Sequence, residues 1–193
     1  MTTRQQPDVR RRHLLEATAR CLAARGAAGV SVRAICAEAN VSPGLLRHYF
    51  AGVSEAIAET YRWTGARVAE ALDRAVAAAG PDPRTRLLAY LTASFRPPIA
   101  DPALLATWLA FWSLTRSDPA VAAVHAELYA EFRSGIERLI AEACPGMTDT
   151  RLPAVALTAL IDGLWLELSL GDAPFTPDEA AALAEAWLDR LLD

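Results

Sequence analysis

The chain has 193 residues, of which 53% are apolar and 22% are charged, and its formal net charge is −4. This composition excludes a disordered chain and predicts a globular protein with a sizeable core. The three cysteines lack metal-ligand spacing, and neither a secretory signal nor a charge-free membrane-spanning run is recognisable, so we expect free, buried thiols in a cytoplasmic protein.

Charge is divided unevenly along the chain. Residues 1–50 carry eight Arg against three acidic residues, which gives +5, whereas residues 51–193 carry eleven Arg against twenty acidic residues, which gives −9. A cationic N-terminal region can approach a polyanion such as DNA, and an acidic remainder cannot. The asymmetry therefore predicts two functional parts and places any nucleic-acid contact in the first.

Apolar residues recur with helical period along almost the whole chain, and no alternating strand pattern is found. The expected helices span residues 9–25, 32–39, 42–50, 53–79, 84–95, 102–115, 119–143, 150–170 and 177–192. Thr176 and Glu179 form a capping box that fixes the start of the last one. We therefore expect an all-α fold of about nine helices.

The second and third helices begin with clear signals. Asn40 favours the left-handed conformation that a tight turn between two helices requires. Ser42 is a suitable N-cap, and Pro43 suits the first helical position, where a missing N–H costs nothing. Ser31 is expected to cap the preceding helix in the same way. These signals predict a helix-turn-helix, which the first helix completes as a three-helix head.

The third helix is expected to protrude from this head and to leave polar and small residues outside. Such a helix fits the major groove of DNA, where its N-terminal residues reach base edges. Arg47 suits a guanine edge or a phosphate, and His48 and Tyr49 suit phosphate oxygens. The alternative is that Arg47 is merely solvated and that Tyr49 packs on Leu45. The residues expected to face DNA are Ser42, Gly44, Leu46, Arg47, His48 and Tyr49.

Three segments carry a family resemblance. The stretch RRRHLLEATARCLAARGAAGVSVRAICAEANVSPGLLRHYFAG resembles the head of the TetR family of one-component transcriptional regulators in its spacing, caps and aromatic end. WLAFW and ALIDGLWLELSL resemble the C-terminal domain of the BetI-type subgroup, named for a choline-responsive repressor. The resemblance covers nearly the whole chain. It implies a helix-turn-helix DNA-binding domain in residues 1–52 and an effector-binding and dimerisation domain in residues 53–193.

The resemblance also implies phosphate contacts by Ser31 and Arg33. One position departs from the family, which commonly has a Lys at the start of the fourth helix, where this chain has Val53. Either backbone N–H groups and Ser54 substitute for that cation, or one phosphate contact is lost. The cluster Arg10–Arg12 is a candidate to compensate.

Aromatic residues and one carboxyl group mark a candidate effector site in the second domain. An aromatic cluster with a carboxylate suits a quaternary ammonium or other cation. In the alternative, the Trp side chains fill the core and the interface, and Asp162 bonds to a neighbouring helix or across a dimer. The candidate ligand-binding residues are Trp63, Trp108, Phe111, Trp112, Asp162 and Trp165.

The expected partners are a pseudo-palindromic double-stranded DNA operator, a small-molecule effector and a second copy of the chain. The last two helices are expected to form the two-fold interface, with recognition helices about 34 Å apart. The expected function is that of a repressor released from its operator by the effector. An effector-independent DNA-binding dimer is the alternative. A helical enzyme is disfavoured, because no catalytic, cofactor or metal motif surrounds His13, His48 or His125.

Overall fold

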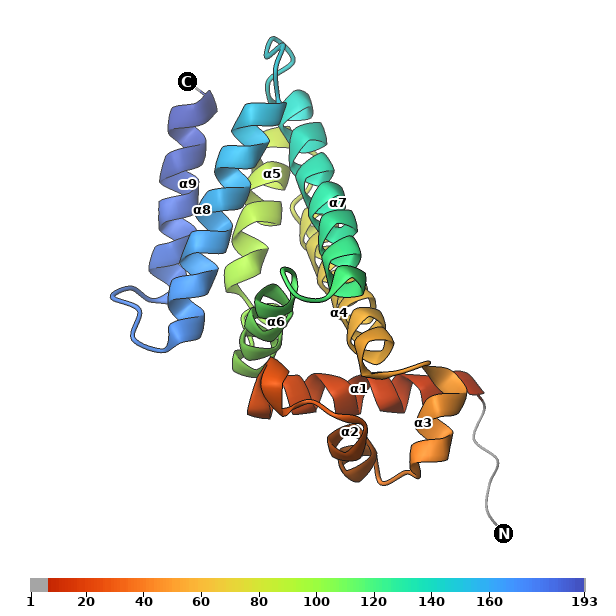
Figure 1. Ribbon diagram of the computed structural model, residues 1–193. Coiled ribbons are helices and arrows are strands. Elements are labelled where there is room, and N and C mark those ends of the chain that lie inside the picture. Colours follow the sequence, from red (N-terminus) through yellow and green to blue (C-terminus); the bar gives the residue numbers. More distant parts are fainter. Residues whose placement is uncertain (1–6, 193) are drawn as a thin grey trace. The chain divides into compact units, whose positions relative to one another are not determined.

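The computed structural model describes residues 7–192, and every regular element in that range is helical (Figure 1). The predicted all-α class is therefore confirmed. The helices are α1 (Pro7–Arg25), α2 (Val32–Ala39), α3 (Pro43–Tyr49), α4 (Val53–Ala78), α5 (Pro83–Thr92), α6 (Pro102–Leu114), α7 (Pro119–Ala143), α8 (Arg151–Leu170) and α9 (Pro177–Leu192), with short 3₁₀ turns at Ala27–Gly29 and Ala93–Phe95.

The chain divides into two compact units. The first unit comprises Met1–Gly65 and Ala106–Ala126, and the second comprises Ala66–Leu105 and Glu127–Asp193. Long helices α4 and α7 each contribute residues to both units.

The predicted signals at the helix ends of the head are confirmed. The hydroxyl of Ser31 accepts a hydrogen bond from the Ala34 N–H at 3.1 Å, and that of Ser42 accepts one from the Leu45 N–H at 3.3 Å. Asn40 adopts the left-handed conformation, with φ 52° and ψ 50°. These local bonds satisfy backbone donors that a helix N-terminus otherwise leaves open.

The head has an apolar core to which all three of its helices contribute. Thr107 joins α6 to this unit by donating its hydroxyl to the Ala19 carbonyl at 3.3 Å, and Arg20 pairs with Glu38 at 2.7 Å. The core residues are Leu14, Leu15, Ala17, Ile35, Cys36, Ala39, Leu46, Phe50 and Ala56.

The prediction that Leu46 faces DNA is wrong. Its side chain is only 1% exposed and belongs to the head core, whereas Leu45 is partly exposed. Leu46 and Phe50 lie four residues apart, which places both on one face of a helical turn, and Phe50 anchors that face in the core. Leu45 is offset by about 100° and lines the surface instead.

In the second unit, α5, α8 and α9 lie side by side (Figure 1). The predicted capping box is present at the start of α9, where Thr176 N–H donates to Glu179 at 2.7 Å and Glu179 N–H donates to Thr176 at 3.2 Å. The expected helix 84–95 ends earlier, at Thr92, and continues as a 3₁₀ turn. The following pair Pro97 and Pro98 lacks the N–H groups that would extend a helix.

Cys21 and Cys36 are buried in the head, and Cys144 is half-buried; all three are free thiols. Burial raises the pKa of both head thiols, which keeps them protonated. The prediction of free, buried thiols is thus confirmed for Cys21 and Cys36, whereas Cys144 is more exposed than predicted.

Candidate nucleic-acid interface and aromatic cluster

The exposed surface of α3 carries most of the residues predicted to meet DNA. Ser42, Gly44, Arg47 and His48 are exposed, whereas Tyr49 is half-buried against the head core. The rings of His48 and Tyr49 meet edge to face with centroids 5.1 Å apart. The helix therefore presents a cation and an imidazole on a surface that its core residues hold in place.

Ser31 and Arg33 are exposed at the start of α2. The Ser31 hydroxyl accepts a hydrogen bond as an N-cap, so its own proton remains available to a second acceptor. The same holds for Ser42. Each serine can thus cap its helix and donate to a phosphate oxygen at once.

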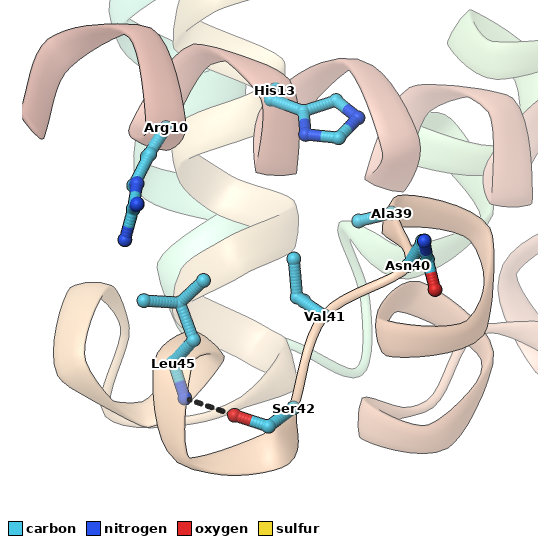
Figure 2. Close-up of a pocket in the computed structure, with 7 residues that line it drawn as sticks. All are labelled: Arg10, His13, Ala39, Asn40, Val41, Ser42 and Leu45. Atoms are coloured by element: carbon cyan, nitrogen blue, oxygen red, sulfur yellow. Dashed lines mark hydrogen bonds between the residues drawn. The ribbon is translucent and has the colours of Figure 1, made fainter. Parts of the chain in front are cut away.

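A groove of about 390 Å³ lies beside the turn between α2 and α3 (Figure 2). Arg10 extends from α1 toward α3 in this view, and the hydroxyl of Ser42 faces the Leu45 N–H. None of the described residues that line the groove is acidic, and its wall combines apolar side chains with the basic groups of Arg10 and His13. The lining residues are Arg10, His13, Ala39, Asn40, Val41, Ser42 and Leu45.

Two of the groups considered as substitutes for a cation at Val53 are already engaged. The Ala51 N–H donates to the carboxylate of Glu55. The hydroxyl of Ser54 donates to Asp118, and this bond is the largest cause of the lowered pKa of that carboxyl. Both groups serve carboxylates of the protein itself, which leaves the first N–H groups of α4 as the backbone substitutes.

The three arginines of the cluster Arg10–Arg12 have different contacts. Arg11 pairs with Glu59 and lies over the Phe50 ring, with its guanidinium carbon 5.6 Å from the ring centroid. Arg12 is 4.0 Å from Glu16. Arg10 lines the groove and is the member of this cluster best placed to compensate for Val53.

An aromatic cluster lies in the first unit, where α4, α6 and α7 contribute residues. The Tyr61 ring is fully buried and stacks on Phe111, with centroids 4.2 Å apart and planes 13° apart. Trp108 meets Tyr61 edge to face at 5.3 Å. A hydrogen bond of 3.0 Å joins the Tyr61 hydroxyl to Nδ1 of His125. Two of the predicted ligand residues, Trp108 and Phe111, therefore meet around a tyrosine.

The other two predicted aromatic residues of this unit differ in their surroundings. Trp63 packs against the head core. The indole nitrogen of Trp112 is buried and has no hydrogen-bond partner among the described residues, and the hydroxyl of Thr64 on α4 shares this condition. Both atoms belong to the same unit as the aromatic cluster.

Asp162 and Trp165 lie in the second unit and have partners there. Asp162 accepts a hydrogen bond of 3.0 Å from the Tyr129 hydroxyl. Burial raises the pKa of Asp162 to about 6, and the Tyr129 bond and the charge of Arg133 oppose this rise. The Trp165 indole N–H donates to the Ser94 carbonyl at 2.7 Å. The first unit therefore holds four of the predicted ligand residues, and the second unit holds two.

Three residues at these sites were missing from the prediction: Tyr61, His125 and Tyr129. Each finds its partner on another helix, 64 residues away for Tyr61 with His125 and 33 residues away for Tyr129 with Asp162. No local spacing rule reports such pairs. The signal that was available is the type of residue: a tyrosine inside an apolar helix face needs a partner for its hydroxyl.

Comparison with known proteins identifies the kind of molecule that carries these features. A model of the bacterial regulatory proteins of the tetR family matches residues 14–55, and a model of the C-terminal region of BetI-type transcriptional repressors matches residues 83–193. The chain belongs to the TetR family of transcriptional regulators. The predicted family and the prediction of a regulator rather than an enzyme are thus confirmed.

Relatives extend over the whole chain. It is 33% identical over 193 residues to the HTH-type transcriptional regulator BetI of Burkholderia cenocepacia, an alignment that covers 96% of this chain and 95% of that protein. A candidate transcriptional regulator of Pseudomonas aeruginosa has a crystal structure with a TM-score of 0.90 and 41% identity, covering 98% of this chain and 93% of that one. A TetR-like fold also occurs in a candidate regulator of Saccharomonospora viridis in complex with choline, with a TM-score of 0.79, 24% identity and coverage of 95% and 97%.

Proposed function

We propose that this TetR-family protein is a repressor that binds operator DNA through α2 and α3 of two subunits and releases it when a small molecule binds. The observation that carries the DNA-binding part is the surface of α3. Arg47 and His48 are exposed there on a helix whose start is capped by Ser42 and whose other face is buried through Leu46. Such a helix presents its polar face to the major groove.

Each exposed group in the head has a role in this proposal. Arg47 reads a base edge or holds a phosphate, and Arg10 supplies the cation that Val53 does not. Leu46 has no contact with DNA, because its side chain is buried. The proposed DNA-contacting residues are Ser31, Arg33, Ser42, Gly44, Arg47, His48 and Tyr49.

A second copy of the chain is the proposed occupant of an exposed apolar surface on α8 and α9. Leu170 is 62% exposed and Trp187 is 52% exposed, and six large apolar side chains left open on two neighbouring helices are typical of an interaction site. A two-fold dimer also supplies the second recognition helix that a pseudo-palindrome requires. The exposed apolar residues of these helices are Leu152, Val155, Leu166, Leu170, Leu183 and Trp187.

Helix α8 is also long and apolar enough to cross a membrane by length and composition alone. The carboxyl group of Asp162 lies in its middle and Thr158 is buried, which suits a helix covered by protein better than one in lipid. We therefore place the protein in the cytoplasm. The proposed domains are a DNA-binding domain in residues 1–52 and an effector-binding and dimerisation domain in residues 53–193.

The dimer is tested by the sedimentation of the full chain. Leu183→Glu combined with Trp187→Glu is expected to give a monomer, because the two charges cannot be buried against a second copy. Val9→Glu places a charge on an exposed apolar residue of α1 and is the matched control. A wild-type monomer at micromolar concentration would contradict the dimer.

The proposed effector is a small molecule, and the six predicted aromatic and acidic residues remain the candidates to bind it. In the first unit the stacked rings around Tyr61 suit a cation, and in the second unit the carboxyl group of Asp162 also does. The choline bound to the Saccharomonospora viridis protein supports the same class. One observation supports the alternative of an effector-independent repressor: Asp162 and Trp165 already have hydrogen-bond partners within the protein.

DNA binding is tested with duplexes selected by the wild-type protein from a random pool. Arg47→Ala is expected to weaken binding about 30-fold or more, because each of the two subunits loses one contact worth about 1–3 kcal/mol. Arg74→Ala on α4 removes the same charge from an exposed residue outside the head and is expected to change binding less than twofold. If the wild-type protein selects no duplex at low salt, the proposal fails.

A further inference from the structure

Two buried polar atoms of the first unit lack the hydrogen-bond partners that comparable atoms have elsewhere in the described residues. The Trp112 indole nitrogen and the Thr64 hydroxyl have no accessible surface and no hydrogen-bond partner in residues 7–192. Thr64 as a whole is only 4% exposed. A buried donor without a partner is unfavourable, and native proteins fill nearly all such sites with protein or water.

Three other buried threonines show what Thr64 lacks. Thr18, Thr60 and Thr158 each donate their hydroxyl to the carbonyl four residues earlier, at 2.7–2.8 Å. This bond is the default for a threonine inside a helix. Thr64 stands on α4 one turn after Thr60 and does not make it. The buried indole of Trp165 likewise has a partner, the Ser94 carbonyl, whereas that of Trp112 has none.

Helical spacing places both residues within one turn of members of the aromatic cluster. Thr64 follows Tyr61 by three residues on α4, and Trp112 follows Trp108 by four residues on α6. Residues at these spacings share a helix face. Tyr61 and Trp108 meet edge to face, so Thr64 and Trp112 each stand one helical turn from a member of the same contact.

We infer that the Trp112 N–H and the Thr64 hydroxyl form a polar subsite for the effector, and that the effector carries an oxygen acceptor which this subsite binds. An indole N–H can only donate, so its partner must offer a lone pair, as a hydroxyl, carbonyl or carboxylate oxygen does. The apolar or cationic remainder of the ligand then lies against the rings of the cluster. This inference rests on the proposed release by a small molecule and names the chemical class of that molecule.

The first experiment measures the melting temperature of shape-preserving variants of the full chain. Thr64→Val removes a hydroxyl without a partner and is expected to keep or raise Tm, whereas Thr60→Val breaks a formed bond and lowers it. Trp112→Phe and Trp165→Phe remove the same ring volume, and Trp112→Phe is expected to lower Tm less. If Thr64→Val and Trp112→Phe lower Tm as much as their controls, a bound water already satisfies these atoms and the inference is wrong.

The second experiment compares two pairs of probes by calorimetry. Choline carries a hydroxyl where propyltrimethylammonium carries a methyl group, and benzyl alcohol carries a hydroxyl where toluene carries a hydrogen. In at least one pair the oxygen-bearing probe is expected to bind the wild-type protein about tenfold more tightly, and Trp112→Phe is expected to abolish most of that difference. Equal affinity within both pairs, or no binding of any probe, overturns the inference. Neither result affects selection of a duplex by the wild-type protein, which tests the proposed function separately.

Discussion

The hydrogen bonds within the head and those within the second unit differ in the sequence separation of their partners. In the head, Ser31 and Ser42 bond to backbone groups three residues away, and Asn40 sets the turn by its own conformation. In the second unit, Tyr129 reaches Asp162 across 33 residues and Trp165 reaches Ser94 across 71. The helix ends and the turn of the DNA-binding surface are therefore set locally, whereas these polar side chains of the second unit depend on contacts between distant segments.

This difference leads to separate expectations for substitutions. A local cap or turn residue changes the stability of one helix end by about 1 kcal/mol, since it governs one or two backbone groups. A residue that joins several elements through the core affects every one of them. Substitutions in the head can measure both effects on unfolding free energy, because Leu46 is a core residue and Asn40 is a turn residue.

Leu46→Ala is expected to have the largest effect. The residue is buried in the head core, and removing such a side chain costs about 2–5 kcal/mol of unfolding free energy. Leu45→Ala, one position away and partly exposed, is the control and is expected to cost less than about 1 kcal/mol. Urea denaturation followed by circular dichroism measures both. Equal losses would show that α3 is not anchored through Leu46.

Asp162 is expected to make the stability of the protein depend on pH. Burial raises its folded pKa from 3.8 to about 6, so the folded protein keeps a proton that the unfolded chain has already lost in this range. The unfolding free energy therefore falls as pH rises from about 4 to about 6, by at most about 3 kcal/mol.

Asp162→Asn keeps an acceptor for Tyr129 but cannot titrate, so this pH-dependent component should disappear and the variant should be the more stable protein at pH 7. Denaturation at a series of pH values and one protein concentration measures the effect. Asp172→Asn, an exposed residue in the loop after α8, is the matched control. Identical pH profiles for the wild type and Asp162→Asn would mean that the carboxyl is solvated.

Asn40→Ala is expected to have the smallest effect and tests the local rule directly. The residue has a φ of 52°, which costs a side chain such as Ala about 1 kcal/mol. Asn40→Gly should cost almost nothing, because Gly accepts this conformation freely. Thermal melts of the pair measure the difference. A larger loss for Gly than for Ala would show that the Asn side chain, and not the backbone, holds the turn.

The reach of these bonds also explains what the sequence could predict. Caps at Ser31 and Ser42, the turn at Asn40 and the capping box at Thr176 are all decided within four residues, and each was predicted correctly. The error at Leu46 arose within the same segment, where two adjacent leucines compete for one core position and only the spacing to Phe50 decides between them.

The candidate effector site was predicted less completely. Trp108 and Phe111 were recognised because they stand close together in the sequence, but Tyr61 and His125 join them from other helices. Whether Trp112 and Thr64 have partners depends on the packing of side chains in three dimensions. Residue spacing contains no record of that packing.

The buried thiols of the head give the protein built-in reporters of its own opening. Cys21 and Cys36 are enclosed by the core, whereas Cys144 near the end of α7 is only half-buried. A thiol-reactive dye should label Cys144 first, and the other two only when the head transiently opens. The labelling rates of Cys21 and Cys36 thus measure how often the head opens, without an engineered probe. Bound operator DNA should lower both rates.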